Sequence, residues 1–246
     1  AIEFVRVTCA FGGRRVLGDI SLSFAPASVT AIIGASGCGK STLLKLCNGL
    51  LRPSGGVVRA FGADLDYRHL PALRRRMGYA VQGTGLFPHL TAHANITLAA
   101  RMADWPARHV DTRLRELLAL MQVDDSLLTR YPHQLSAGQQ QRVGLCRAMM
   151  LRPEVLLLDE PFAAIDPITR RDIHEQLLEL LAVEPVTVLL VTHDMREAMQ
   201  LASRIVVLGG GRVVADQAVD DLRAGYPGME PEALLDTLLP RDDAQA

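Results

Sequence analysis

Aromatic residues are scarce in this chain, and several features that mark whole classes of protein are missing. Only 4% of its 246 residues are Phe, Tyr or Trp while 49% are hydrophobic, so the core is expected to be aliphatic. No apolar run approaches the roughly 20 residues that cross a bilayer. The first residues lack the charged and apolar regions of a secretory signal. We therefore expect neither a membrane-spanning nor a secreted protein.

Charge and cysteine content exclude further classes. The net charge is −1, which leaves no basic field of the kind that attracts nucleic acid. Cys9, Cys38, Cys47 and Cys146 show no paired metal-ligand spacing. They are expected to be free thiols in a reducing compartment. The length suits one domain, or one domain with a subdomain.

A glycine-rich segment carries the strongest signal. Residues 34–42 read Gly34-Ala35-Ser36-Gly37-Cys38-Gly39-Lys40-Ser41-Thr42 and fit the phosphate-binding pattern G-x-x-x-x-G-K-[ST]. A short β-branched run precedes it and a leucine-rich helical run follows, which is the context that the motif needs rather than that of an ordinary turn. Backbone N–H groups and the helix N-terminus would face phosphate oxygens. Lys40 would reach the β- and γ-phosphates, and Ser41 would ligate Mg²⁺.

The rest of the chain alternates strand and helix, which predicts an α/β protein with a mixed, mostly parallel sheet. Residues 2–8 and 16–24 read as paired antiparallel strands around the turn at Phe11-Gly12-Gly13. Residues 1–88 and 151–215 are expected to form the core. About 89–150 reads as a helical subdomain, in which Trp105 is expected to pack. Residues 216–246 are expected to be a surface appendage.

Two further segments carry candidate chemistry. A buried strand at 155–158 ends in Asp159-Glu160, where one carboxylate could hold Mg²⁺ and the next could polarise water. Taken alone, this is as consistent with a polar strand end. The segment Leu135-Ser136-Ala137-Gly138-Gln139 begins a helix whose N–H groups suit an anion, although a plain helix cap explains it equally well.

With these motifs in order, the chain resembles an ATP-binding-cassette (ABC) transporter ATPase over residues 1–215. The family pattern matches Gln82 as the Q-loop glutamine, Leu135–Gln139 as the signature, Asp166 in the D-loop, and His193 as the switch histidine. Phe11 falls where the family stacks an aromatic ring on adenine. Ala137 and Ile165 depart from the usual glycine and leucine.

The resemblance implies a P-loop fold of the ABC type, with ATP and Mg²⁺ as cofactors. Glu160, His193 and Gln82 would be catalytic, and Ser41, Gln82 and Asp159 would serve the metal. It also implies a homodimer in which each signature caps the ATP of the other subunit. Permease subunits and, indirectly, a substrate-binding protein would be partners, at the cytoplasmic face of the inner or plasma membrane.

Residues 82–91, 131–134 and 166–170 most resemble the importer ATPases for glycine betaine, choline and carnitine. Polar amino acid and sulfonate or nitrate importers remain alternatives for the solute. A soluble, non-transport ABC ATPase is an alternative of another class, and a phosphate-loop kinase would leave the signature and His193 without a role. His89 and His133 are expected to be structural or interface residues.

Overall fold

The computed structural model describes residues 1–83 and 85–239. Thr84, within the importer-like segment 82–91, and residues 240–246 of the predicted appendage lie outside the described residues. The chain forms two compact units. The first unit comprises Ala1–Leu70 and Thr187–Ala246, and the second comprises Pro71–Val186. The predicted division at 88/89 and 150/151 therefore stays a prediction about subdomains.

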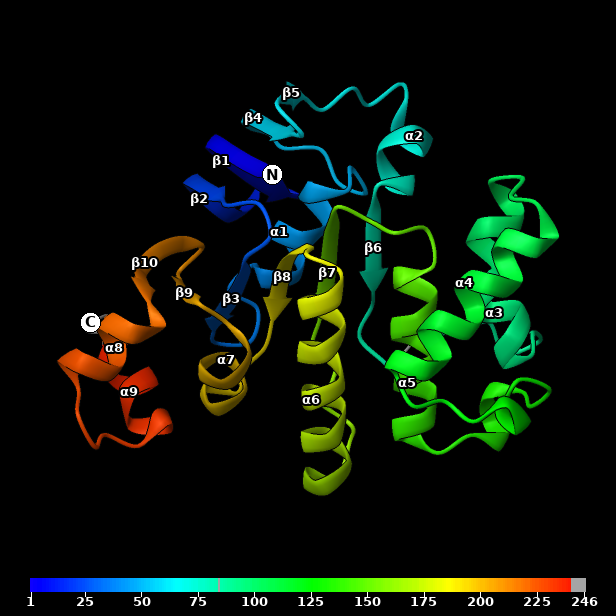
Figure 1. Cartoon of the computed structure of the whole chain (residues 1–246). Helices are drawn as coiled ribbons and strands as arrows, with labels where there is room; N and C mark the ends of the chain where they lie inside the picture. Colours follow the sequence, from blue (N-terminus) through cyan, green and yellow to red (C-terminus); the bar gives the residue numbers. More distant parts are fainter. Residues whose placement is uncertain (84, 240–246) are drawn as a thin grey trace. The chain divides into compact units, whose positions relative to one another are not determined.

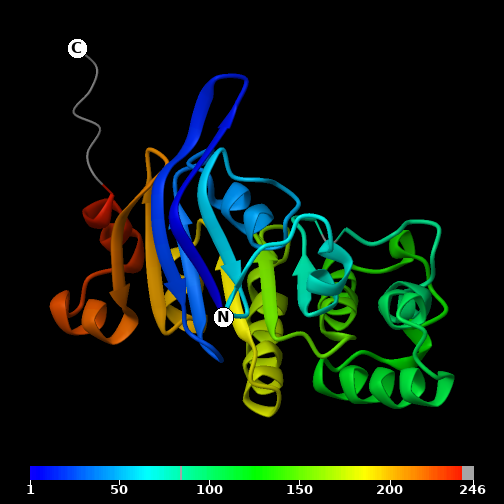
Figure 2. The same cartoon turned by 90° about the horizontal axis from the view of Figure 1, so that it is seen from above.

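An antiparallel sheet begins the first unit. Strands β1 (Ile2–Phe11), β2 (Arg14–Phe24), β4 (Gly55–Ala60) and β5 (Ala63–Asp64) lie in the order β2-β1-β4-β5. Phe11 pairs with Arg14 across a turn whose two glycines have positive φ, so β1 and β2 form the long hairpin drawn in blue in Figure 2. The expected N-terminal antiparallel part is confirmed, with strands longer than predicted.

Buried parallel strands form the second sheet region of this unit. Strand β3 (Val29–Gly34) lies between β8 (Thr187–Val191) and β9 (Arg204–Gly209) and is parallel to both. Strand β10 (Arg212–Ala218) is antiparallel to β9. Helix α1 (Lys40–Cys47) follows β3, and α7 (Met195–Leu201) follows β8. Because β3 and β8 run in the same direction, the loops after them leave one edge of the sheet.

The C-terminal residues differ from the predicted appendage. The expected boundary at 215/216 falls inside β10, and the next elements are α8 (Val219–Gly225) and α9 (Pro231–Leu238). Val219, Leu222 and Leu234 are buried in one core cluster with residues of β3, β9 and α7. Figure 1 shows α8 and α9 beside α7. These two short helices are part of the core because they cover apolar side chains that would otherwise face water.

The second unit combines two parallel strands with helices. Strand β6 (Met77–Ala80) pairs in parallel with β7 (Val155–Asp159). The helices, drawn mainly in green and yellow in Figure 1, are α2 (Leu70–Arg75, which begins at the unit boundary), α3 (Ala92–Met102), α4 (Ala107–Leu120), α5 (Ala137–Met149) and α6 (Pro167–Val183). Short 3₁₀ turns lie at Asp125–Leu127 and Pro132–Gln134. Between 89 and 150 the described residues are helical or irregular, as predicted.

None of the helices within residues 1–83 and 85–239 is long and apolar enough to cross a bilayer.

Candidate functional site

The glycine-rich loop joins β3 to α1 in the first unit. Strand β3 ends at Gly34, and Gly39 caps α1 in a left-handed conformation with φ of 107°. Lys40 is the first helical residue, and Ser41 and Thr42 follow in the first turn. Ser36 and Gly37 are exposed, whereas Cys38 is half-buried. The predicted order of strand, glycine loop and helix is therefore present.

The side chain of Lys40 folds back onto the glycine-rich loop. Its side chain is 6% exposed, and Nζ donates hydrogen bonds to the carbonyl oxygens of Gly34 at 2.7 Å and Ala35 at 3.0 Å. These contacts bring an ammonium group to a loop that already ends in a helix N-terminus. Both charges favour an anion, which is the chemistry that a phosphate group requires.

His193 leaves the same edge of the sheet as this loop. Val191 of β8 lies opposite Ile32 of β3, and the N–H of Thr192 donates to the carbonyl of Ile32 at 3.2 Å. His193 comes next and is exposed, and Asp194 then caps α7. In the same unit, Phe11 is 46% exposed at the β1–β2 turn. A ring in that position is free to stack on a planar group.

In the second unit, two predicted catalytic residues meet. Gln82 follows β6 and Glu160 follows β7, and Ala80 lies opposite Leu158 in this parallel pair. The amide Nε2 of Gln82 donates to Oε2 of Glu160 at 3.4 Å. Glu160 has a φ of 46°, an uncommon conformation for a residue with a side chain. Such strained conformations gather at functional sites.

Asp159 ends β7 and is buried at 4% exposure. The hydroxyl of Tyr79 on β6 donates to Oδ2 of Asp159 at 3.5 Å. Sequence reasoning missed Tyr79, because a lone tyrosine inside an apolar strand carries no motif. Its pairing with Asp159 follows only from the register of β6 and β7.

A cavity of about 470 Å³ opens beside Glu160. Gln82 and Glu160 line one part of it. Ala163, with Ala164 and Ile165 of the D-loop, lines another, and the first turns of α5 line a third. Ala137 and Gln140 represent α5 in this lining. The second unit therefore brings together the glutamine, the carboxylate, the D-loop and the start of the signature helix.

The signature segment is a well-formed helix start. Ser136 caps α5, with Oγ accepting from the N–H of Gln139 at 3.2 Å, and Oε1 of Gln139 accepts from the N–H of Ser136 at 2.9 Å. Ser136 and Ala137 are exposed, and Leu135 and Gly138 are buried. A Cβ added at Gly138 would lie 2.4 Å from Cγ2 of Thr169 in α6, so glycine permits close packing of the two helices.

Asp166 caps α6. Its Oδ1 accepts from the N–H of Thr169 at 3.0 Å, and this hydrogen bond holds the pKa of Asp166 below its usual value. The D-loop is thereby tied to a 17-residue helix, Pro167–Val183.

The residues predicted to bind the metal all offer oxygen atoms as ligands. The described residues contain no group of three or more His, Cys, Asp or Glu that could hold a metal by themselves. Ser41, Gln82 and Asp159 offer a hydroxyl, an amide carbonyl and a carboxylate, which are the ligands that Mg²⁺ accepts alongside water and substrate phosphate. Ser41 belongs to the first unit, and Gln82 and Asp159 belong to the second.

Comparison with known proteins identifies the family. The model of the family described as ABC transporter matches residues 17–163, which span the glycine-rich loop, the signature and Asp159-Glu160. The chain belongs to the ABC transporter family. The predicted family, fold class and ATPase class are confirmed.

Two curated relatives and one solved structure show the likeness in detail. The glycine betaine uptake system ATP-binding protein YehX of Escherichia coli is 44% identical over 87% of this chain and 69% of its own length. The choline transport ATP-binding protein OpuBA of Bacillus subtilis is 42% identical over 86% of this chain, which spans about half (55%) of OpuBA. The dimeric bacterial ABC transporter cassette MJ0796 superposes with a TM-score of 0.81 at 30% identity, covering 89% of this chain and 99% of that one. A second structure of MJ0796 is a post-hydrolysis dimer bound to ADP and phosphate, which supports nucleotide as the ligand of this fold.

Proposed function

We propose that this ABC ATPase is the ATP-hydrolysing subunit of a bacterial importer for a quaternary-amine osmoprotectant. The pairing of Gln82 with Glu160 at 3.4 Å carries the catalytic part, because it places a polarising carboxylate beside an amide at the ends of two parallel strands. The solute rests on the names of YehX and OpuBA, which concern glycine betaine and choline.

Each motif has a role in this proposal. Phe11 stacks on adenine, and the loop N–H groups with Lys40 bind the β- and γ-phosphates. Ser41, Gln82 and Asp159 would provide oxygen ligands for Mg²⁺. Mg²⁺ would neutralise charge that develops on the phosphates. Glu160 accepts a proton from the water that attacks the γ-phosphorus, ADP leaves, and His193 contacts the γ-phosphate.

The dimer and the membrane partners belong to the same proposal. Ser136 and Gly138 of one subunit cap the γ-phosphate bound by the other, so two ATP molecules join the subunits. In this proposal, Gln82 also lies at the start of a segment that contacts the permease, and it reports the nucleotide state to the permease. The chain then works as a peripheral protein at the cytoplasmic face of the membrane, and the binding protein and permease select the solute.

Glu160→Gln tests the catalytic and dimer parts together. The variant should keep ATP affinity and lose turnover by at least about 100-fold, because only proton acceptance is removed. Trapped ATP should then hold a dimer that size-exclusion chromatography with MgATP detects. A variant that binds ATP but stays monomeric at high protein concentration would contradict the proposed cross-subunit site.

The solute is tested separately. The chain is reconstituted in proteoliposomes with its permease and binding protein. ATP-dependent uptake of labelled glycine betaine or choline is expected, with a polar amino acid and a sulfonate as competitors. Uptake of a competitor in their place would reject the osmoprotectant assignment and leave the ATPase assignment intact.

A further inference from the structure

The loop that follows β7 forms one wall of the cavity of about 470 Å³ in the second unit. Five of its residues line that cavity: Glu160, Pro161, Ala163, Ala164 and Ile165. Phe162 is outside the lining and is only 1% exposed. The ring of Phe162 is therefore buried behind a loop whose other residues face the cavity.

His174 of α6 packs against this ring. The centroids of the imidazole and phenyl rings lie 4.5 Å apart, and the ring planes meet at 70° in an edge-to-face arrangement. His174 is 3% exposed, so both rings are buried. Aromatic pairs favour particular ring orientations, and this contact therefore restricts the direction of the Phe162 side chain. Sequence reasoning missed both residues, because a lone phenylalanine or histidine carries no motif.

Two further contacts from α6 hold the end of the same loop. Nη2 of Arg170 donates to the carbonyl oxygen of Ile165 at 3.1 Å. Asp166 caps the helix through the N–H of Thr169 at 3.0 Å. Residues spaced by four lie along one side of a helix, and positions 166, 170 and 174 have this spacing. One face of α6 therefore contacts the loop at three successive positions.

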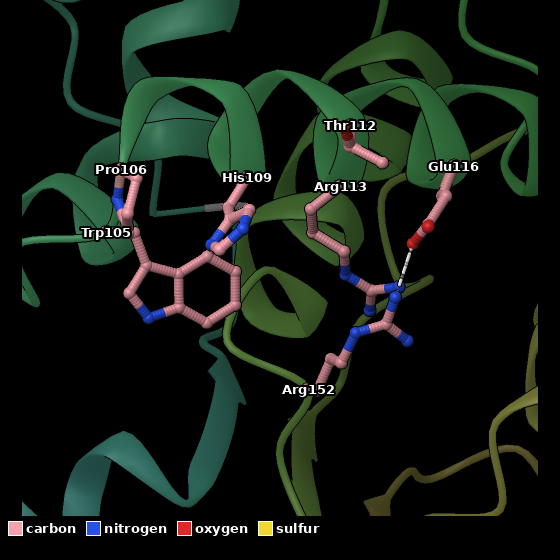
Figure 3. Close-up of a pocket in the computed structure, with 7 residues that line it drawn as sticks. All are labelled: Trp105, Pro106, His109, Thr112, Arg113, Glu116 and Arg152. Atoms are coloured by element: carbon pink, nitrogen blue, oxygen red, sulfur yellow. Dashed lines mark hydrogen bonds and ion pairs between the residues drawn. The ribbon is translucent and has the colours of Figure 1, made fainter.

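Ion pairs hold the far end of α6. The buried guanidinium group of Arg113 donates to both carboxylate oxygens of Glu184, the residue after α6. Arg152 also donates to Glu184, and both arginines donate to Glu116, so two cations face two anions. Figure 3 shows these arginines beside a cavity of about 340 Å³, where Trp105, predicted to pack in the helical subdomain, is half-buried. With its far end fixed by this neutral network, α6 is a firm support for the loop.

We propose that Phe162 and His174 are positioning residues for the catalytic carboxylate. Phe162 lies two residues after Glu160, whose φ of 46° is an uncommon conformation that the surrounding structure must maintain. The ring contact with α6 fixes the backbone on this side of Glu160. Without the His174 ring the loop has other arrangements, and fewer molecules have Glu160 placed to accept a proton from water. This inference rests on the proposed role of Glu160.

Steady-state ATP hydrolysis by His174→Ala tests this role. The variant should lose about tenfold in kcat, since a small displacement of a catalytic group can cost up to roughly 100-fold in rate. Its KM for ATP should stay within about twofold of the wild type, because the phosphate-binding loop belongs to the first unit and is unchanged. An unchanged kcat, or a loss that appears in KM alone, would overturn the proposal.

Leu180→Ala is the matched control for loss of packing in α6. Leu180 is fully buried in the last turn of the same helix, so its truncation also leaves a cavity. Below the unfolding temperatures of both variants, Leu180→Ala should keep the wild-type kcat. An equal loss of kcat in the two variants would attribute the effect to packing and reject the positioning role. Should circular dichroism show that His174→Ala does not fold, His174→Leu, which nearly keeps the side-chain volume, replaces it with the same expected results.

A double-variant cycle tests whether the two rings act together. Phe162→Leu should lower kcat about as much as His174→Ala, and the double variant should lose no more than about tenfold, because both changes remove one contact. Losses that multiply to about 100-fold would show independent effects and contradict the proposal.

Failure of this inference is distinct from failure of the proposed function. An inactive Glu160→Gln beside a fully active His174→Ala would reject the positioning role alone. Wild-type turnover that Glu160→Gln does not reduce, or no turnover in the wild type, would reject the proposed role of Glu160 and this inference with it.

Discussion

At the scale of single residues, a side chain at either of two glycines of the phosphate-binding loop would force neighbouring atoms to move. A Cβ at Gly34 would lie 2.2 Å from the carbonyl oxygen of Leu208, and one at Gly39 would lie 2.5 Å from Cδ2 of Leu17. A Cβ at Gly37 would meet nothing within 4 Å, although its φ is also positive, at 77°. In the packing of this chain, position 37 therefore requires glycine only for its positive φ. Position 34 requires glycine both for its positive φ and for the close contact with Leu208.

Gly34→Ala and Gly37→Ala separate these two requirements. Gly37→Ala should lower the free energy of unfolding by about 1 kcal/mol, the cost of a left-handed alanine. Gly34→Ala should lower it at least about twice as much, because β3 must also move away from β9. Urea unfolding of both variants measures the difference. Equal losses would mean that the contact with Leu208 relaxes without cost.

The four cysteines should differ in reactivity. Cys9, Cys47 and Cys146 are buried, and burial raises the pKa of Cys9 and Cys47 and that of Cys146 to about 12, so their thiolates are scarce at neutral pH. Cys38 is half-buried in the phosphate-binding loop. A maleimide should therefore label Cys38 first and inactivate the ATPase, with protection by MgATP and resistance in an active Cys38→Ser variant. Peptide mapping checks the site, and labelled yet fully active protein would contradict the prediction.

At the scale of elements, the start of α5 combines an exposed cap with a tightly packed turn. Ala137 is exposed, so its methyl group contacts solvent in this chain, while Gly138 packs on Thr169. The alanine that replaces the family's usual glycine at position 137 therefore affects contacts with another molecule, such as a second subunit.

Ala137→Gly should preserve or raise ATP turnover without changing the affinity of the monomer for ATP, since glycine allows closer backbone approach. Its cost in unfolding free energy should stay within about 1 kcal/mol. Gly138→Ala is the matched control, and should destabilise the protein more because its Cβ would lie 2.4 Å from Thr169. Steady-state rates and urea unfolding measure both effects. Lower turnover in Ala137→Gly would reveal a contact made by that methyl group.

At the scale of the whole molecule, the motifs fall into two units. The phosphate-binding loop, Phe11 and His193 belong to the first unit, and Gln82, Glu160, the signature and Asp166 belong to the second. Nucleotide binding by a monomer and closure of a dimer should therefore respond to different substitutions.

Lys40→Ala should lose ATP affinity, because a charge-assisted contact with phosphate is removed. Ser136→Arg should bind ATP as well as the wild type but fail to dimerise in the Glu160→Gln background, because a bulky cation replaces an exposed cap. Ser136→Ala controls for loss of the cap, which costs about 1 kcal/mol. A fluorescent ATP analogue and size-exclusion chromatography give the two readouts. Equal loss of nucleotide binding in Lys40→Ala and Ser136→Arg would place both residues at one site in the monomer.

Strong local patterns made much of the fold predictable. The apolar strands before Gly34 and Asp159 and the leucine stripe of α4 are fixed by their own residues, and the structure contains all three. Strand β10 and helix α8 were missed, because seven-residue elements with mixed polarity carry little periodic signal. Their burial depends on the apolar surface of β3, β9 and α7, which no local pattern shows.

The sequence by itself determined the phosphate-binding loop, the carboxylate pair, the signature and their order, because each depends on residue types at fixed spacing along a few residues. Only the tertiary structure decided which of them meet. Parallel pairing of β6 and β7 brings Gln82 to Glu160 and Tyr79 to Asp159 across 78 and 80 residues of chain. The packing of α4 against the ends of α5 and α6 likewise creates the cavity of Trp105 and Arg152. Such contacts follow from strand register and helix packing, which are set by the burial of the whole core.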